Sequence, residues 1–325
     1  MARLLFAVLA VLGLLAGPAL ADQDDPEARD LRAEAFYFGR GVKRDPRQAY
    51  ELARPLAEQG FPRSQMVMGS LLYDGQVVER DPSAAFAYFS KAAEGGSTIG
   101  QLFSGLMLYG GDGVEEDKKR ALAFFRQAAE GGNPEAQFHV GLMLQKGEGA
   151  AKDAAGAIAA FRLAAGQGHL ASQVALGNVF GSGLGVPQDM AEAARWYRLA
   201  ADQGDPGSQY LLGLAYYFGD GVPRDVAEAT KWLGRAAEGG EIDAAYNLGV
   251  MYAKGEGVAR NGPMAIKWFR LASDGGDARS MYSLGYLHDS GDLVPQDRQE
   301  ALRWYRLAIR NGNLEARERV AELEQ

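Results

Sequence analysis

Few side chains in this sequence could perform catalysis or hold a metal ion. The 325 residues include no cysteine and only three histidines, His139, His169 and His288. Without cysteine the chain has no thiol nucleophile, no thiolate metal ligand and no disulfide. Protein zinc sites usually combine several histidines or cysteines, whereas these histidines are scattered along the chain. We therefore expect them to be structural residues rather than ligands.

The short motifs of common enzymes are missing as well. The patterns Ser-x-x-Lys, Gly-x-Ser-x-Gly and His-Glu-x-x-His do not occur, and neither does a phosphate-binding loop. Many of the aspartates fall at positions typical of helix N-caps, where they accept backbone N–H groups. The sequence thus predicts a protein that is not an enzyme and that has no catalytic residue, cofactor or metal.

Four short loops place an acidic residue between two glycines, an arrangement that invites a calcium-binding interpretation. The loops are Gly111-Asp112-Gly113, Gly147-Glu148-Gly149, Gly219-Asp220-Gly221 and Gly255-Glu256-Gly257. Calcium needs about six to eight oxygen ligands around one point. Each loop supplies a single carboxylate, and the loops are well separated in sequence. Solvated turns are therefore the favoured interpretation.

The charge of the chain disfavours two classes of partner. Its 34 Lys and Arg residues are outnumbered by 42 Asp and Glu residues, which gives a formal net charge of −8. Nucleic acids and anionic membrane surfaces attract basic proteins. We therefore expect no nucleic acid partner and no binding to an anionic membrane surface.

The sequence repeats itself every 36 residues through eight copies, without an insertion. One column of glycines consists of Gly39, Gly75, Gly111, Gly147, Gly183, Gly219, Gly255 and Gly291. A column of alanines consists of Ala49, Ala85, Ala121, Ala157, Ala193, Ala229, Ala265 and Ala301. A fixed period of this length is typical of repeat architectures. The copies cover 26–313, between a leader at 22–25 and a tail at 314–325 that we expect to form a C-terminal capping helix.

Each copy has the pattern of two helices joined by a glycine-containing link. In the second copy, apolar residues at helical spacing predict a first helix over Ser64–Asp74, which Gly75 ends in the left-handed conformation. Asp81 is the expected N-cap of a second helix with Pro82 at its first position. No segment has the pattern of a strand. The prediction is an all-α fold of stacked αα-hairpins, a solenoid, because one hairpin cannot bury its own apolar face.

One position inside the first helix is glycine in seven copies, although glycine costs about 1 kcal/mol of helix propensity relative to alanine. These residues are Gly69, Gly105, Gly141, Gly177, Gly213, Gly249 and Gly285. We expect the backbone of the second helix to lie too close to this position for a side chain. On the second helix, aromatic pairs such as Phe124/Phe125 and Trp268/Phe269 alternate with small residues, so that neighbouring helices can interdigitate.

Together these columns resemble a known repeat. In one copy the match consists of Leu212-Gly213, Tyr216, Gly219-Asp220-Gly221-Val222, Asp225, Ala229, Trp232, Ala236-Ala237 and Gly240. Over essentially its whole length after residue 21, the chain is similar to the Sel-one-like repeat (SLR) family, relatives of the tetratricopeptide repeat. The resemblance implies a right-handed α-superhelix that serves as an adaptor surface for other proteins. Because the chain has no cysteine, it differs from the branch of the family whose disulfides staple the hairpins.

Two further columns on the first helix are candidates for binding. Gln65, Gln101, Gln137, Gln173 and Gln209 could hold a bound peptide backbone or tie adjacent helices together, and the structural role is favoured. An apolar stripe beside the core face could line a groove, as tetratricopeptide-like stacking implies, or pack between repeats. Its candidate partner-binding residues are Tyr73, Tyr109, Phe138, Tyr210, Tyr217, Tyr246 and Tyr282.

The first 21 residues have the pattern of a signal peptide. Arg3 is followed by the apolar stretch Leu4–Leu15, then by Gly17-Pro18 and by the small-x-small site Ala19-Leu20-Ala21. The apolar stretch is shorter than the ~20 residues that a bilayer span requires. The prediction is cleavage after Ala21 and a periplasmic or secreted protein that is not inserted in the membrane.

Three functions are compatible with this pattern. The first is an exported, non-catalytic scaffold that binds a protein segment in the groove of the solenoid, with a possible regulatory role. The second is an assembly factor for envelope polysaccharide or peptidoglycan, whose aromatic side chains contact sugar faces. A hydrolase is a remote third, because the catalytic motifs are missing.

Overall fold

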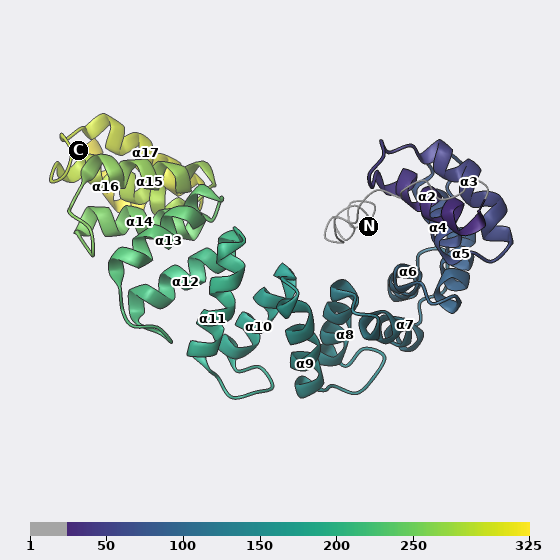
Figure 1. Cartoon of the computed structure of the whole chain (residues 1–325). Coiled ribbons are helices and arrows are strands. Elements are labelled where there is room, and N and C mark those ends of the chain that lie inside the picture. Colours follow the sequence, from purple (N-terminus) through teal and green to yellow (C-terminus); the bar gives the residue numbers. More distant parts are fainter. Residues whose placement is uncertain (1–24) are drawn as a thin grey trace. The chain divides into compact units, whose positions relative to one another are not determined.

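The structure is a computed structural model that describes residues 25–325. The predicted signal peptide and residues 22–24 lie outside the described residues. Within 25–325 the chain forms seventeen α-helices and no strand, as predicted (Figure 1). In this part of the chain no helix is both long enough and apolar enough to cross a membrane.

Sixteen of the helices form eight hairpins of a first helix, A, and a second helix, B, each thirteen residues long. The A helices are α2 (Pro26–Phe38), α4 (Pro62–Asp74), α6 (Thr98–Gly110), α8 (Pro134–Lys146), α10 (Leu170–Ser182), α12 (Pro206–Phe218), α14 (Ile242–Lys254) and α16 (Ala278–Ser290). The B helices are α3 (Pro46–Glu58), α5 (Pro82–Glu94), α7 (Lys118–Glu130), α9 (Ala154–Gly166), α11 (Met190–Asp202), α13 (Val226–Glu238), α15 (Gly262–Asp274) and α17 (Arg298–Arg310). A last helix, α18 (Ala316–Glu324), packs on α17 within the segment predicted to cap the solenoid.

Local hydrogen bonds define the helix ends. The Asp81 carboxylate accepts the N–H of Ala84 at the start of α5, and an acid or Asn261 does the same at the start of every other B helix. Gly75, with a φ of 67°, ends α4 in the left-handed conformation. The predicted ends are confirmed, except that α4 begins at Pro62 rather than Ser64. Proline is favoured in the first turn because its fixed φ suits a helix and its missing N–H would have no partner there.

The glycines inside the A helices make room for a ring. A Cβ atom added at Gly105 would lie 2.7 Å from the Phe125 ring, and one at Gly141 would lie 2.5 Å from the Phe161 ring. Both phenylalanines are fully buried. The predicted close approach is therefore confirmed, but in six of the seven copies the nearest neighbour is an aromatic ring of the B helix and not its backbone. Gly213 is the exception, because a Cβ atom there would lie 2.9 Å from the Leu233 side chain and 3.2 Å from the Leu233 backbone nitrogen.

The glutamine column ties consecutive repeats together. Gln65 donates from its side-chain amide to the carbonyl oxygen of Ala57 at 3.3 Å, and Gln209 donates to Ala201 at 3.1 Å. In each case the acceptor lies eight residues earlier, in the last turns of the preceding B helix. Gln101 and Gln137 make the same bond. The structural interpretation of this column is confirmed.

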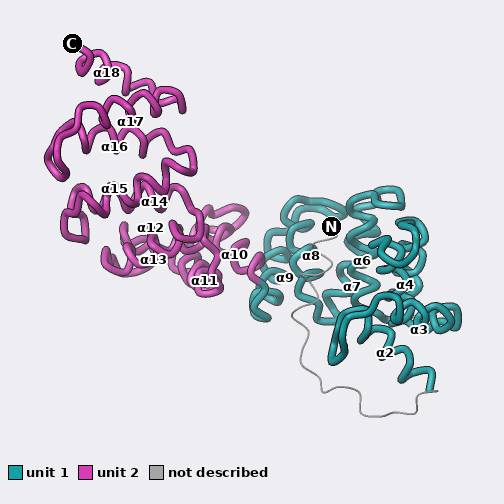
Figure 2. The backbone as a smooth tube through the Cα atoms, turned by 90° about the horizontal axis from the view of Figure 1, so that it is seen from above, with its two compact units in different colours: residues 1–169 teal, residues 170–325 magenta. Residues whose placement is uncertain are grey.

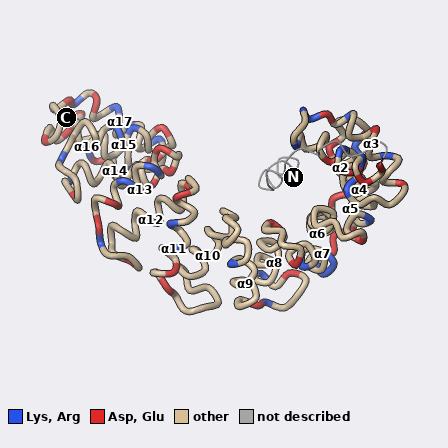
Figure 3. Tube along the Cα trace, viewed as in Figure 1, with Lys and Arg blue, Asp and Glu red and all other residues tan. Residues whose placement is uncertain are grey.

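The chain divides into two compact units, residues 1–169 and 170–325 (Figure 2). The described part of the first unit contains four hairpins, and the second contains four hairpins and α18. Within each unit, every B helix packs against its own A helix and against the A helix of the next repeat. Acidic and basic residues are interspersed along both units (Figure 3).

Candidate binding pocket on the A helices

The seven residues predicted to contact a partner lie on the A helices at two registers. Phe138, Tyr210, Tyr246 and Tyr282 occupy the fifth position of their helices, and Tyr73, Tyr109 and Tyr217 occupy the twelfth. Positions five and twelve are seven residues apart, about two helical turns, so the two registers share one side of the helix. The structure gives the two groups different surroundings.

The tyrosines of the twelfth register bond to the link of the next repeat. The Tyr73 hydroxyl donates to Asp112 at 2.6 Å, Tyr109 donates to Glu148 at 2.7 Å, and Tyr217 donates to Glu256 at 2.5 Å. These acceptors are acids of the Gly-acid-Gly loops. The loops are turns, as favoured from the sequence, but these three acids have a further role that was not expected, because they hold one repeat to the preceding one.

The environment of these tyrosines keeps their hydroxyls protonated. Burial, followed by the bond to Asp112, raises the pKa of Tyr73 to about 12. The bond to Glu148, followed by burial, raises the pKa of Tyr109 to about 12. A neutral phenol can donate to the neighbouring carboxylate, whereas a phenolate would repel it. The hydroxyls of Tyr73, Tyr109 and Tyr217 thus form hydrogen bonds between consecutive repeats.

All four members of the fifth register pack against neighbouring side chains, Tyr246 with its ring 6.0 Å from that of Phe269 and Tyr282 with its ring 5.4 Å from that of Tyr305. The Phe138 ring lies 5.8 Å from the Phe161 ring and 5.2 Å from the His169 ring. The Tyr210 hydroxyl accepts a long hydrogen bond, 3.5 Å, from the side-chain amide of Asn247. Neither Phe138 nor Tyr210 lines the pocket that contains Tyr246 and Tyr282.

Two of the histidines meet at one carboxylate. The Nε2 atoms of His139 and His169 lie 3.4 Å and 3.1 Å from the two oxygens of Glu135. Burial opposes ionisation of Glu135, but the two imidazoles outweigh it and lower the pKa of this carboxyl to about 2. The sequence analysis missed this cluster because His169 is 34 residues from Glu135. In the described part of the chain, no group of three or more His, Cys, Asp or Glu residues is placed to hold a metal ion.

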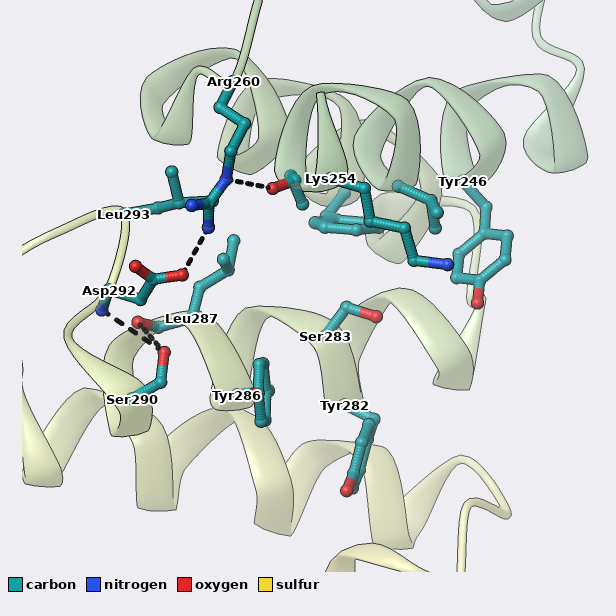
Figure 4. A pocket seen from close by; sticks show the side chains of 13 residues that line it. Tyr246, Lys254, Arg260, Tyr282, Ser283, Tyr286, Leu287, Ser290, Asp292 and Leu293 are labelled. Atoms are coloured by element: carbon teal, nitrogen blue, oxygen red, sulfur yellow. Dashed lines mark hydrogen bonds and ion pairs between the residues drawn. The ribbon is translucent and has the colours of Figure 1, made fainter. Parts of the chain in front are cut away.

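Tyr246 and Tyr282 come together in a pocket of about 650 Å³ within the second unit. The pocket lies between α14 and α16, the A helices of the seventh and eighth repeats (Figure 4). α14 contributes Tyr246 and Lys254 to the lining, and α16 contributes Tyr282, Ser283 and Tyr286, of which the Tyr282 ring points away from α14 in Figure 4. Its volume is in the range of about 300–1,000 Å³ that is usual for ligand pockets.

Tyr286 is a pocket residue that the sequence analysis missed. It lies four residues after Tyr282, so both side chains project from the same side of α16. Its side chain is large and aromatic, yet 56% of it is exposed. The only sequence signal was this spacing, because the equivalent position in the preceding repeat is Val250.

The pocket tyrosines differ from those of the twelfth register in their hydrogen bonding. Nothing between residues 25 and 325 hydrogen-bonds to the hydroxyls of Tyr246, Tyr282 or Tyr286. The ring of Tyr246 is covered on one side by Arg279, whose guanidinium carbon lies 4.4 Å from the ring centre. Three phenol groups, each able to donate and accept, are therefore available around one cavity.

A sequence model of the Sel1 repeat matches eight consecutive segments of the chain. They are residues 26–61, 62–97, 98–133, 134–169, 170–205, 206–241, 242–277 and 278–313. The chain belongs to the Sel1 repeat family. The resemblance noted from the sequence is confirmed, and proteins of this family generally act through protein–protein interaction on a scaffold that is typically non-catalytic.

Two solved Sel1 repeat structures are similar to this one. The first is c5321, a protective antigen of uropathogenic Escherichia coli strains with an SLR fold, at 31% identity and a TM-score of 0.84. The match covers 92% of this chain but only 64% of c5321. The second is a Sel1 repeat protein from Oxalobacter formigenes, at 32% identity and a TM-score of 0.66, over 98% of this chain and 99% of that one. No curated protein matches the chain.

Proposed function

We propose that this Sel1 repeat protein is an exported scaffold that binds a segment of a partner protein through its A helices. The pocket between α14 and α16 is the principal contact. The observation that carries this proposal is the set of three tyrosines, Tyr246, Tyr282 and Tyr286, whose rings line an open cavity and whose hydroxyls are unbonded. Tyrosine is enriched at binding hot spots because its rigid ring buries a large area and its hydroxyl adds a directed bond.

Two observations support export. The apolar N-terminal stretch with its small-x-small site has the pattern of a signal peptide. In addition, the similar protein c5321 is described as a protective antigen. Cleavage after Ala21 and a periplasmic or secreted location are accordingly part of the proposal.

The second candidate is recognition of envelope polysaccharide or peptidoglycan. The same pocket favours it, because the exposed Tyr286 ring, in a lining that also contains the Ser283 hydroxyl, could pack on a sugar face. A protein segment is preferred because proteins of the Sel1 repeat family generally bind other proteins.

Affinity capture from an envelope extract of the source organism tests the function. The bait is the mature protein, compared with a Tyr282→Ala/Tyr286→Ala variant and with Leu271→Ala. Leu271 is a suitable control because it lies on α15, is 41% exposed and does not line the pocket. We expect a protein retained by the wild type and by Leu271→Ala to be lost from the double variant. Equal capture by all three baits would refute the proposal, and capture abolished by muramidase treatment of the extract would favour the polysaccharide alternative.

A further inference from the structure

The charges that line the pocket indicate what kind of segment it accepts. Its lining contains two cations, Lys254 and Arg260, and one anion, Asp292. The lining therefore has a net positive charge, although the chain as a whole has a net charge of −8. A local charge opposite to that of the whole molecule favours a ligand with an anionic group.

Arg260 and Asp292 neutralise each other. The Arg260 guanidinium bonds to the Asp292 carboxylate, and its Nε donates to the carbonyl oxygen of Ala253 at 3.1 Å (Figure 4). This arginine thus joins the end of α14 to the link after α16. The charge of Arg279, which lies over the Tyr246 ring, is also neutralised, because this arginine pairs with Asp243 at 2.5 Å and with Asp277 at 2.8 Å.

Lys254 is the loosely paired cation of the pocket. Its Nζ lies 3.8 Å from Glu256, and 65% of the side chain is exposed. Glu256 already accepts the short hydrogen bond from Tyr217. A surface pair at this distance contributes little, so a ligand carboxylate could replace Glu256 as the partner of Lys254 at small cost.

The rest of the lining is suited to a short extended chain with an apolar side chain. Val250, Phe269 and Leu287 are three of the aliphatic or phenyl side chains of the lining, of which Val250 is half-buried and the other two are buried. From Tyr282 to Ser290 the lining follows α16 for eight residues, or about 12 Å. An extended peptide advances about 3.3 Å per residue, so the pocket accommodates roughly four residues. The free phenol groups can donate to the carbonyl oxygens of such a segment.

We propose that this pocket binds an extended acidic segment of a partner protein, with a carboxylate on Lys254 and an apolar side chain against Tyr282, Tyr286 and Leu287. The inference rests on the proposed scaffold function and adds the chemical class of the segment. Charge complementarity selects the carboxylate, and the apolar surface selects its neighbour.

Selection from a library of randomised heptapeptides displayed on phage tests the inference, with the full mature protein as the target. We expect the enriched sequences to combine Asp or Glu with an apolar residue. The Lys254→Glu variant should lose this enrichment. Binding of a selected synthetic peptide, measured by calorimetry, should weaken about tenfold in Lys254→Gln, the equivalent of ~1.4 kcal/mol, and should weaken further at higher salt.

Lys231→Gln is the matched control, because Lys231 is 69% exposed on α13, outside the pocket, and its loss changes the net charge equally. Circular dichroism of each variant confirms that it is folded. Absence of any enriched peptide, enrichment without acidic residues, or equal weakening by Lys231→Gln would overturn the inference. If the Tyr282→Ala/Tyr286→Ala bait still loses a captured protein in that case, the scaffold function stands and only the acidic segment is rejected.

Discussion

At the scale of single residues, the same amino acid has different roles in this solenoid according to its register. Tyr73 is 7% exposed and bonds to Asp112 of the next repeat, whereas Tyr286 is 56% exposed with an unbonded hydroxyl. A buried hydrogen bond to a charged acceptor stabilises a fold, while an exposed phenol adds little. Substitutions that remove only the hydroxyl can therefore separate the two roles.

The Tyr73→Phe variant should be less stable than the wild type by about 1 kcal/mol, because Asp112 loses a hydrogen bond in a half-buried site. Tyr286→Phe removes the same atom from an open position and should change the free energy of unfolding by less than about 0.5 kcal/mol. Urea unfolding followed by circular dichroism measures both. Equal effects would mean that the bond between repeats contributes nothing.

A second residue-scale prediction concerns the glycine column. The Gly141→Val variant should lose about 2 kcal/mol or more of stability, because its side chain would meet the fully buried Phe161 ring. Gly166→Val, in the same unit, is the control, since no atom lies within 4 Å of a Cβ at that position. Thermal melting that is unchanged in Gly141→Val would show that the ring can move aside.

At the scale of the elements, the B helices differ in the aromatic side chains that they carry. The aromatic pair of α7 is Phe124 and Phe125, whereas α9 has Ala160 and Phe161 at the same positions and begins Ala154-Ala155-Gly156. Asp153 still caps α9 by accepting the N–H of Gly156 at 2.8 Å. The start of the helix is therefore intact, and what distinguishes α9 is the missing ring at position 160.

We expect the amides of α9 to exchange hydrogen faster than those of α5 and α7, which belong to the same unit. Ala160 takes the place of the half-buried Phe124 ring and offers a smaller apolar side chain, burial being worth about 25 cal/mol per Å², and repeat proteins can open one repeat at a time. Hydrogen exchange followed by mass spectrometry compares residues 150–165 with the equivalent peptides of the two preceding repeats. Slower or equal exchange at 150–165 would contradict the prediction.

At the scale of the whole molecule, the chain is a series of similar joints between repeats. The Gln65 amide and the Tyr73 hydroxyl each cross one joint, to Ala57 and to Asp112. In the seventh repeat the tyrosine is replaced by Ala253, and Arg260 instead bonds to the acid of the next link, Asp292. Because each joint involves only neighbours, the stability of the molecule is approximately a sum over joints.

This sum predicts a loss of stability in alkali. The pKa values of Tyr73 and Tyr109 are raised to about 12, whereas a tyrosine in the unfolded chain ionises near 10. A raised folded-state pKa contributes stability that is fully present below pH ~10 and is lost as the pH rises towards ~12. The melting temperature should therefore fall over this range.

The control is the Tyr73→Phe/Tyr109→Phe variant, which lacks both ionisable groups. Its melting temperature should fall less between pH ~10 and ~12, so that the advantage of the wild type narrows. Parallel curves for the two proteins would show that these hydroxyls are not linked to folding.

The 36-residue period, the helix ends and the all-α fold could be predicted from the sequence because they depend on local interactions. Asp81 caps a helix through the N–H of Ala84 three residues away, and Gly75 ends one through its own φ. The period adds only that eight such hairpins must stack, because none can bury its apolar face alone. The sequence also predicted that position 141 requires glycine, but it did not predict that the Phe161 ring lies against that position.

Only the tertiary structure decided which tyrosines are available to a partner. Tyr73 and Tyr246 belong to the same predicted stripe, but an acid from the next repeat occupies the hydroxyl of Tyr73, and no such acceptor reaches Tyr246. The pocket likewise depends on the packing of α14 against α16, which begins 36 residues later in the sequence, with Phe269 of α15 also in the lining. Contacts of this kind cannot be predicted from the spacing of residues along a helix, because they depend on which side chains of different helices come close in space.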